Sequence, residues 1–467
     1  MVYNINIFIG GFIMKKILSL LFLPLLLVAC NTNEASNSTS SKVSSSYSST
    51  TPIDSSSESS FVKKEGYIYD EQDLINIKNN LNGTYYLAND IVLNNKWSTI
   101  GDKENPFTGS INGNGHSIKN LIIDSSLTMT EETSTLGRDL ISVGGFIGYL
   151  KGSINNLRIE NYKITLSNQL PSVSNYNSTT TEYKIFVGAL VGINKGTITD
   201  CYSNGEIDVT SKCNIARGRI GGLVGKNESI LTSSSTSGKI KANFTHENIR
   251  AGGLVGASEG GKIEKCSSSN NIEISNLNGK SIAGGLVGMV EFSEISNCYA
   301  TGNVKTSSNR ASTAGGLVGL IDATIAGTTI ISKCYAIGSL DANATEKSSY
   351  AGGIVGNCEV LLGGTNGLIG DVTIKDCIYT GNKITAKGTY KAHGGAIISC
   401  IEGNSTQHTI TIQNCNYLTG VTLNVSGITE SKKNSQGKEY TNLNELINTI
   451  SWGNEWKIVE GSLPSLQ

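Results

Sequence analysis

Proline and histidine are scarce in this chain, and long helical runs of Leu, Ala, Glu and Lys are absent from it. The 467 residues include only 5 Pro and 4 His, whereas 54 are Gly. Charged residues make up 16% of the chain and the formal net charge is −1, so there is no basic field to attract nucleic acid. Abundant Gly, Ser, Thr and Asn with few helix formers predicts an all-β chain with many turns.

The amino-terminal region has the pattern of an export signal. Lys15 and Lys16 precede the apolar run ILSLLFLPLLLVA, which stops at Cys30. This run is shorter than the ~20 residues that a membrane-spanning helix needs. A positive segment, an apolar segment and a small residue before the cut are typical of a signal peptide, which we place at residues 1–29. Met14 is an alternative start.

The stretch LVAC, which ends at Cys30, resembles the bacterial lipobox. The resemblance implies that Cys30 is diacylated on its sulfur and anchors the mature protein in a membrane. The alternative is an ordinary export signal with an incidental Cys. Residues 31–60 are mostly Ser, Thr and Asn, which cannot bury enough apolar surface to order the chain. We therefore predict a lipid-anchor Cys and a disordered tether over residues 30–64.

A glycine-pair motif recurs along the rest of the chain. It reads VGGFIG, VGALVG, IGGLVG, AGGLVG (three copies), AGGIVG and HGGAII, and these copies start at Val143, Val187, Ile220, Ala251, Ala283, Ala314, Ala351 and His393. A base period of about 31 residues with insertions is typical of stacked-repeat proteins. Each unit continues with a segment such as SEISNCYATGNVKT, in which apolar residues alternate as they do in strands. We predict a right-handed parallel β-helix with about three short strands in each repeat.

The GGLVG core and the trailing CYxTG resemble the GLUG motif of bacterial surface proteins, among them adhesin-like proteins and some secreted IgA-cleaving metallopeptidases. The resemblance covers about residues 143–420, and the family's fold is taken to be β-helical. Departures occur at Leu157 and Ser234, which replace the repeat Cys, and in the last copy, which reads GGAIIS. The HENIR segment at His246 lacks the second His of a zinc-protease motif, so the peptidase chemistry is not carried over.

Two sets of residues are predicted to build the repeat core. The glycine pairs would permit tight corners and close approach of neighbouring coils, and the clearest are Gly252, Gly253, Gly284, Gly285, Gly315 and Gly316. The repeat cysteines are expected to stack as a buried file: Cys201, Cys266, Cys298, Cys334, Cys377 and Cys415. Inter-coil disulfides are an alternative, although in-register side chains give poor S–S geometry. No Cys/His spacing indicates a metal site.

Both ends of a solenoid need covering, because they expose core and unpaired edges. We assign residues 65–142 to an amino-terminal cap and opening coils, 143–424 to the GLUG-type repeats and 425–467 to a carboxy-terminal cap. Asp70 is expected to cap a first short helix that stops by Gly83. Thr441 is expected to cap a second one that stops by Gly453, with Trp452 and Trp456 covering the last coil. The alternative is that either helix packs on a side face.

Insertions are the natural place for a binding surface in a solenoid. Longer segments precede the glycine pairs at 125–140, 167–184 and 341–350, and others follow them at 320–330 and 357–371. Tolerated loop drift without a partner is the alternative.

Motifs for catalysis are weak. GASEG at Gly256 fits G-x-S-x-G but lies in a repeat turn, not at a strand-to-helix elbow. A carbohydrate-active β-helix would need clustered carboxylates on one face, and the aligned strand positions give no Asp/Glu ladder. The position before the repeat Cys is read as a solvated face; it holds Asp200, Lys265, Asn297, Lys333 and Asp376.

The sequence therefore predicts a lipid-anchored bacterial surface protein without a cofactor. Its expected role is non-catalytic, as an adhesin-like or scaffold binding protein for an extracellular glycan or a host or matrix protein. The alternative is a β-helical enzyme that acts on extracellular polysaccharide. A two-lobed solute-binding lipoprotein is disfavoured because nothing alternates helix and strand.

Overall fold

The computed structural model describes residues 62–125, 129–134, 137–168, 181–213, 216–324, 326–360, 370–402, 409–433 and 437–467. The predicted signal peptide, Cys30 and nearly all of the tether lie outside this part. Residues 62–467 form one compact unit, which is described by itself. Within the described residues, no helix has both the length and the apolar character that a membrane crossing requires.

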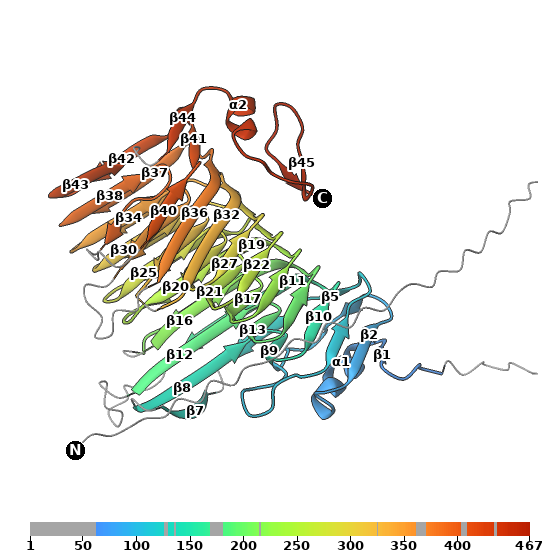
Figure 1. Cartoon of the computed structure of the whole chain (residues 1–467). Coiled ribbons are helices and arrows are strands. Elements are labelled where there is room, and N and C mark those ends of the chain that lie inside the picture. The colour runs from blue at the N-terminus through green and yellow to red at the C-terminus, as the bar shows by residue number, and fades with distance from the viewer. Residues whose placement is uncertain are drawn as a thin grey trace, which may run out of the picture. The chain divides into compact units, whose positions relative to one another are not determined.

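Short parallel strands stacked coil upon coil build this unit, and they form the right-handed parallel β-helix that the repeat predicted (Figure 1). One coil shows the plan. It runs through β25 (Lys280–Gly284) in sheet C and β26 (Val287–Glu291) in sheet B, then through β27 (Glu294–Ser296), β28 (Tyr299–Ala300) and β29 (Val304–Ser308) in sheet A. Each strand pairs in register with its equivalents one coil before and one coil after. The repeat period is thus one turn of the helix.

Sheets B and C each take one strand from almost every coil. Besides β25, sheet C contains β7 (Met129–Ser134), β8 (Gly137–Gly144), β12 (Thr181–Gly188), β16 (Ala216–Gly221), β20 (Ile249–Gly252), β30 (Ala311–Gly315), β34 (Ser348–Gly352), β38 (Lys391–Gly395) and β43 (Thr429–Lys433). Besides β26, sheet B contains β9 (Ile147–Leu150), β13 (Val191–Asn194), β17 (Val224–Asn227), β21 (Val255–Glu259), β31 (Val318–Asp322), β35 (Val355–Glu359) and β39 (Ile401–Glu402).

Sheet A wraps the rest of each coil. Besides β27, β28 and β29, it contains β1 (Tyr67–Ile68), β2 (Thr84–Leu87), β3 (Ile91–Val92), β4 (Ser110–Asn112), β5 (Ser117–Lys119), β6 (Ile122–Ser125), β10 (Ser153–Asn155), β11 (Arg158–Asn168), β14 (Thr197–Thr199), β15 (Tyr202–Ser211), β18 (Ile230–Thr232), β19 (Ser235–Phe244), β22 (Lys262–Glu264), β23 (Ser267–Ser268), β24 (Asn271–Asn276), β32 (Thr328–Ala336), β33 (Leu340–Ala344), β36 (Asp371–Tyr379), β37 (Lys383–Gly388), β40 (Ile410–Gln413), β41 (Asn416–Leu418), β42 (Thr422–Ser426) and β44 (Lys438–Tyr440). An antiparallel pair follows at the carboxy end, β45 (Trp456–Lys457) with β46 (Ser465–Leu466).

Alternation along each strand separates the interior from the outer surface. In β26, Val287 and Val290 join the continuous interior core, whereas Met289 lies in a separate cluster on the outside. Glu291 follows on the outer side. Because every coil repeats the inward positions, the interior becomes a set of stacked files of Leu, Ile, Val and Cys.

A short helix closes the amino-terminal end, as expected. Asp70 caps α1 (Glu71–Asn76) by accepting from the backbone N–H of Asp73 at 2.9 Å, and a 3-10 turn (Ile77–Asn79) ends the element before Gly83. Leu74 and Ile77 are fully buried and belong to the interior core. They cover the first coil because their side chains extend the stacked apolar files by one layer.

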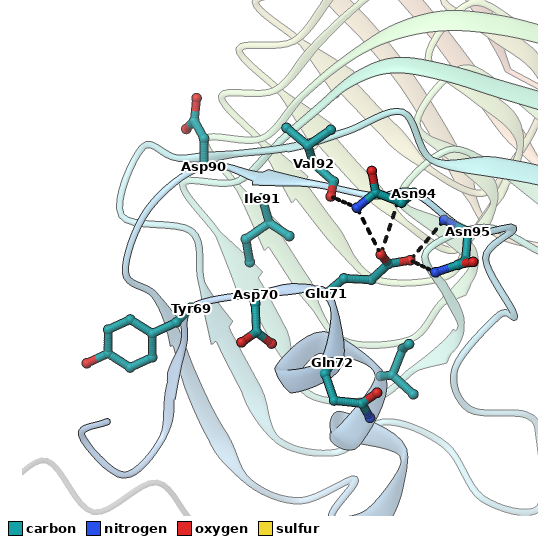
Figure 2. Close-up of a pocket in the computed structure, with 10 residues that line it drawn as sticks. Tyr69, Asp70, Glu71, Gln72, Asp90, Ile91, Val92, Asn94 and Asn95 are labelled. Atoms are coloured by element: carbon teal, nitrogen blue, oxygen red, sulfur yellow. Dashed lines mark hydrogen bonds between the residues drawn. The ribbon is translucent and has the colours of Figure 1, made fainter. Parts of the chain in front are cut away.

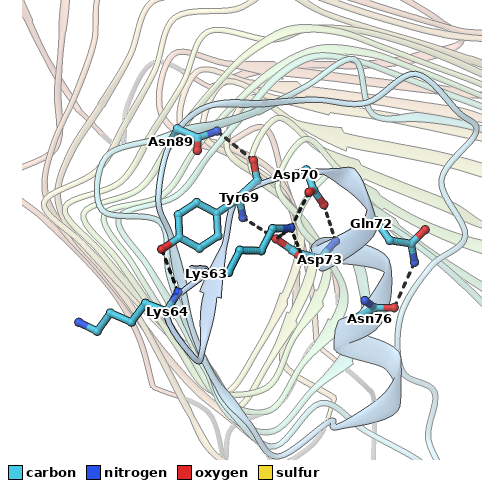
Figure 3. A network of polar contacts seen from close by, with 8 residues as sticks. All are labelled: Lys63, Lys64, Tyr69, Asp70, Gln72, Asp73, Asn76 and Asn89. Carbon is cyan, nitrogen blue, oxygen red and sulfur yellow. Dashed lines mark hydrogen bonds and ion pairs between the residues drawn. The ribbon is translucent and has the colours of Figure 1, made fainter. Parts of the chain in front are cut away.

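Ion pairs and hydrogen bonds hold α1 in place. Lys63 Nζ lies 2.6 Å from Asp70 and 2.8 Å from Asp73 (Figure 3). On the other side of the helix, the Glu71 carboxylate accepts from the backbone N–H groups of Asn94 and Asn95, both at 3.1 Å (Figure 2). The cap is thereby tied to the chain before it and to the loop after β3.

The second helix differs from the expectation in two ways. Its N-cap is Asn442, not Thr441, and α2 (Leu443–Asn448) ends well before Gly453. Trp452 and Trp456 do not cover the last coil. They pack on an outer strip of sheet A, against Tyr335, in a cluster distinct from the interior core. The segment 441–467 is therefore a side-packed strap, which is the alternative that the sequence left open.

The strap is held by a specific contact. Trp456 Nε1 donates to the side chain of Asn297 at 3.0 Å, and Tyr335 donates its hydroxyl to the carbonyl of Pro464 at 2.8 Å. Tyr299 and Tyr335 stack with ring centroids 4.8 Å apart, because they occupy the same outward position in consecutive coils. This aromatic strip offers the strap an apolar surface beside the coils.

The segments read as insertions have mixed outcomes. Residues 341–350 are not a long loop, since β33 and β34 cover all but residues 345–347. Within 125–140, β7 and β8 form an antiparallel pair. Parts of 167–184 and 357–371 lie outside the described residues.

Candidate functional site

The second glycine of each pair is required by the stacking of coils. A Cβ built on Gly285 would lie 2.9 Å from the Cβ of Ala300 and closer still to the carbonyl oxygen of Gly316. Gly316 meets Gly353 and Ala336 in the same way. Gly253 meets the Ser268 hydroxyl and the carbonyl of Gly285. Here glycine is needed for close approach and not for an unusual backbone angle.

The first glycine of each pair is confined by its own turn and by the next coil. A Cβ on Gly252 would lie 2.6 Å from the backbone nitrogen of Gly288 and against the carbonyl of Val255. Gly284 and Gly315 are in equivalent surroundings, against Val287 and Val318. The paired glycines therefore form the sharp corner that joins sheet C to sheet B.

The repeat cysteines stack in one interior file. All nine cysteines in the described part of the chain are buried and unbridged. Cys266 donates its backbone N–H to the sulfur of Cys298 at 3.4 Å, and the Cys298 thiol donates to the carbonyl of Ser296 at 3.1 Å. Ser234 takes the same position and accepts from the Cys201 N–H at 3.1 Å. Cys334 continues the file, and its thiol donates to Ser332.

The pKa of the thiols differs along the file. At Cys334 the effect of burial is outweighed by hydrogen bonds with Cys298 and Cys377, which lower the pKa of that thiol. Burial raises the pKa of Cys201 to about 12 and holds the pKa of Cys298 well above its usual range. A thiol reacts and binds metal through its thiolate, so these residues serve the core. In the described part of the chain, no group of three or more His, Cys, Asp or Glu residues is arranged to hold a metal ion.

The residue before each repeat Cys forms a left-handed corner. Its φ is +53° at Asn297, and the same holds at Asp200, Lys265, Lys333 and Asp376. The sequence predicted a solvated face at this position. The left-handed backbone conformation gives a further reason for the residue types found there. Asn and Asp tolerate this conformation better than most residues. Asn297 has the added task of accepting from Trp456.

The expectation that no carboxylate ladder exists is wrong. Acidic residues occupy the same outward position at the end of the sheet B strand in six consecutive coils: Glu228, Glu259, Glu291, Asp322, Glu359 and Glu402. Strand pairing places Glu259 beside Glu291, Asp322 beside Glu359, and Glu359 beside Glu402. We call these six residues the acidic file. Neighbouring strands in a sheet lie about 4.8 Å apart, so the file is a dense row of negative charge.

Two arginines from sheet C face this file. Arg219 and Arg250 pair in register on β16 and β20, two residues before the glycine pair of each coil. Arg219 Nε lies 3.3 Å from Glu259, and its guanidinium lies 5.4 Å from the ring of Phe186. The outer faces of sheets B and C therefore meet at a corner whose opposing side chains touch. We call it the outer corner.

An apolar floor lies in the outer corner beside the charged groups. Ala257, Met289 and Leu320 from sheet B contact Ile282 from sheet C, and each is 2% exposed or less although it points away from the interior. Tyr149, Phe186 and Ile193 form a similar cluster a few coils earlier. Burial of outward-facing side chains shows that this corner is re-entrant.

Ion pairs neutralise much of the acidic file. Lys226 Nζ lies 2.8 Å from Glu228 and 2.5 Å from Glu259. Lys280 Nζ lies 2.9 Å from Glu359. The cations of the pairs lower the pKa of Glu259 against the opposing effect of its burial.

Three members of the acidic file form no ion pair with the described residues. Asp322 accepts from Thr324 at 2.6 Å and Glu402 accepts from Asn357 at 3.2 Å, whereas Glu291 differs from both. Its carboxylate makes no hydrogen bond or ion pair with the described residues, and it lies between Glu259 and Asp322. Desolvation, followed by the repulsion of these two neighbours, raises the pKa of Glu291 to about 7. Arg250 opposes this shift, and burial lowers the pKa of Arg250 itself to about 10.

The carboxy-terminal end of the outer corner has its own polar set. Tyr350 on β34 donates its hydroxyl to Glu402, and Asn357 on β35 donates its amide to the same carboxylate at 3.2 Å. The ring of Tyr350 stacks on His393 with centroids 5.5 Å apart. Sheets B and C are thus bridged here by an aromatic hydroxyl instead of by a guanidinium.

A separate pocket lies between α1 and the loop after β3 (Figure 2). Each of its carboxylates already has a partner: Glu71 holds Asn94 and Asn95, Asp70 pairs with Lys63, and Asp90 pairs with Lys119 at 2.7 Å. These groups tie the cap to the first coils, so we interpret the pocket as structural.

The remaining sequence motifs take structural places. Ser258 of GASEG is fully buried in β21 and faces Ser293 at 3.1 Å, which is not a nucleophile elbow. His246 contacts Thr245, and His116 lies 3.5 Å from Asp90.

The acidic file has a sequence signal that is separate from the motifs described above. In five repeats an Asp or Glu stands six residues after the second glycine of the pair, from Glu228 to Glu359, and Glu402 stands seven after it. Alignment on the cysteines, which lie on the next sheet, hides this regularity because the spacing between the two landmarks varies. Nothing in the sequence pairs Arg219 or Arg250 with the file.

Comparison with known proteins agrees with the repeat. The model of the GLUG motif matches residues 247–273 and 280–305, so the chain contains GLUG repeats. Halomucin from Haloquadratum walsbyi is 32% identical over 120 residues, which is 26% of this chain and 1% of halomucin. The chain thus spans only a small fraction of this curated relative.

Solved structures give a distant likeness. A candidate immunoglobulin A1 protease from Bacteroides ovatus has a TM-score of 0.35 at 18% identity, over 86% of this chain and 91% of that one. An IgA1 protease has a TM-score of 0.35 at 16% identity, over 70% of this chain and 23% of that one. The A-module of a mannuronan C-5 epimerase from Azotobacter vinelandii has a TM-score of 0.21 at 12% identity, over 80% of this chain and 96% of that one. At these scores the likeness carries no argument about function.

Proposed function

We propose that this chain is an exported bacterial surface lipoprotein, anchored through Cys30, whose β-helix is a non-catalytic adhesin-like or scaffold binding module. The export pattern, the lipobox-like LVAC and the Ser/Thr-rich tether support export and anchoring. The β-helix supplies a stiff body in which each coil is fixed by its neighbours. Its partner is an extracellular glycan or a host or matrix protein.

The outer corner is the observation that carries this proposal. Interior positions repeat from coil to coil and serve packing, whereas the outer corner gathers charged, amide and aromatic side chains over an apolar floor. A few convergent polar groups are typical of ligand sites, where they fix the orientation of the ligand. Ion pairs hold three of the six carboxylates of the acidic file, Glu228, Glu259 and Glu359, which favours recognition over proton transfer.

A second candidate function is an enzyme acting on extracellular polysaccharide. The observation in its favour is the pair Glu259 and Glu291, adjacent in register, with the pKa of one lowered and the pKa of the other raised. Carboxylates whose environments separate their pKa values are the usual arrangement for general acid and base roles.

One experiment separates the two functions. Purified full-length protein is incubated with a panel of glycans and matrix proteins, and both retention and product mass are measured. Retention without new products is the expected result. New products would overturn the non-catalytic role. If no member of the panel is retained, the binding role fails.

The anchor has its own test. Cys30→Ala should move the mature protein from the detergent phase to the aqueous phase in a detergent partition experiment. Unchanged partitioning would overturn anchoring through Cys30 and leave the binding role untouched.

A further inference from the structure

Hydrogen-bonding groups without a partner lie along the outer corner. Arg219 is 9% exposed, and its Nη1 has no hydrogen-bond partner among the described residues. Arg250 Nε, one coil on, is likewise buried without one, and so is Asn357 Oδ1 on β35, three coils beyond Arg250. A buried polar group without a partner costs about 1–3 kcal/mol, so two arginines adjacent in register call for an explanation.

These groups include both donors and acceptors. Arg219 and Arg250 present only donors, whereas Asn357 Oδ1 and the carboxylate of Glu291 present only acceptors. The two arginines are adjacent in register on sheet C, and Glu259 and Glu291 are adjacent in register on sheet B. The 3.3 Å contact between Arg219 and Glu259 sets the two rows face to face. A ligand in the corner meets donors on one wall and acceptors on the other.

The charges nearly balance along the corner. Arg219, Lys226 and Lys280 offset carboxylates of the acidic file through direct pairs. A polyanion would face Glu291 and Asp322, which repel it. A bare cation would find no ready set of ligands among the described residues. The remaining chemistry is that of an uncharged ligand rich in groups that both donate and accept.

The apolar floor is closed to a ligand. Ala257, Met289, Leu320 and Ile282 are each 2% exposed or less, so they support the polar groups and offer no apolar surface of their own. A ligand therefore meets the corner through hydrogen bonds, and each hydroxyl of a sugar both donates and accepts. We propose that the outer corner binds a neutral oligosaccharide, with hydroxyls bridging Arg219 and Arg250 to Glu291. This inference deepens the proposed function and rests on it.

The test uses the full-length protein and a panel of neutral oligosaccharides: cello-, xylo-, manno- and chito-oligosaccharides. Affinity is measured by isothermal titration calorimetry for the wild type, Arg250→Gln and Glu291→Gln. Each variant removes charge-assisted hydrogen bonds and should weaken binding of the retained sugar at least tenfold. Lys305→Gln is the matched control, because Lys305 forms an exposed 2.7 Å pair with Glu273 on sheet A. It should bind as the wild type does.

Each outcome bears on a separate claim. Circular dichroism and thiol protection confirm that the variants are folded, and Glu291→Gln gives a near-isosteric second probe. Sugar binding that neither corner variant weakens would overturn the corner as the site. Retention of a matrix protein with no sugar bound would overturn the ligand class and leave the proposed function standing. Sugar cleavage that both variants abolish would support the corner as the sugar site and overturn the non-catalytic role.

Discussion

Replacement of Glu291 by Gln tests the electrostatics of the outer corner without reference to any ligand. The Glu291 pKa is raised from 4.5 to about 7, chiefly by desolvation and then by Glu259 and Asp322. A tenfold change in a proton equilibrium corresponds to about 1.4 kcal/mol, so the full rise amounts to about 3 kcal/mol. The side chain is partly exposed, and solvent screening reduces the expected effect to about 1–2 kcal/mol.

The direction of the stability change follows from the link between proton binding and folding. A carboxyl whose pKa is higher in the folded state favours folding most when it is protonated. Its contribution is complete below about pH 4.5 and is lost as the pH rises through about 7. Gln mimics the protonated form at every pH. Glu291→Gln should therefore match the wild type near pH 4.5, and at pH 8 its free energy of unfolding should be higher by about 1–2 kcal/mol.

The measurement is urea unfolding of the wild type and variant at both pH values, followed by tryptophan fluorescence and far-UV circular dichroism. Long repeat arrays can unfold in stages, so coincidence of the two probes must be checked before free energies are compared. Glu273→Gln is the control, because its pair with Lys305 lowers the pKa of Glu273 and both side chains are exposed. An equal difference at both pH values, or a Glu291→Gln variant less stable than wild type at pH 8, would refute the reasoning.

Three further predictions concern the scaffold. Gly285→Ala should destabilise the protein by about 1–3 kcal/mol, because the new Cβ meets the Gly316 carbonyl and Ala300. The control is Gly420→Ala, where a built Cβ meets nothing within 4 Å and only the strain of a positive φ is expected. Equal urea midpoints for the two variants would contradict the steric argument. The nine buried thiols should resist alkylation in native protein and react only in denaturant, whereas rapid native modification of Cys266 or Cys298 would exclude the interior file. Trp456→Ala should lower the local stability of the strap by about 3–5 kcal/mol and expose residues 441–467 to limited proteolysis, while the coils stay resistant. Simultaneous digestion of the strap and the coils would show that the strap is integral to the β-helix.

The fold was predictable because one observation determines it. A glycine pair that returns at a nearly constant interval, with alternating apolar residues after it, permits a stack of strands and little else. The first helix was predictable for a local reason, since the Asp70 cap and the apolar spacing of Leu74 and Ile77 need only neighbouring residues. Both features depend on short-range patterns.

The carboxy-terminal strap was not predictable from its own sequence. Its apolar residues fit either the open end of the stack or an outer surface. The choice depends on Tyr299 and Tyr335, which lie more than a hundred residues away and form a ready aromatic strip only after the coils have stacked. The hydrogen bond from Trp456 to Asn297 then fixes the position.

The outer corner shows a different kind of limit. The acidic file follows from a nearly constant offset in the sequence and could be predicted, but its meaning depends on which sheet it faces. Arg219 and Arg250 precede Glu259 and Glu291 in the chain by more than a full coil. Only the re-entrant angle between sheets B and C brings the two rows together. A search for spaced motifs finds residues on one strand and misses a site whose halves lie on facing sheets.

The order of residues along the outer corner gives the site a direction. Interior positions repeat, so only the outward positions distinguish one coil from the next. The corner begins with Tyr149, Phe186 and Ile193, continues through the two arginines to the apolar floor at Ile282, and ends with Tyr350 over Glu402. These coils are held in register by parallel strand pairing, so the order is rigid. On the proposed assignment, an oligosaccharide that spans several coils meets first the two arginines and last the pair of Tyr350 and Glu402, and it therefore binds in one orientation along the stack.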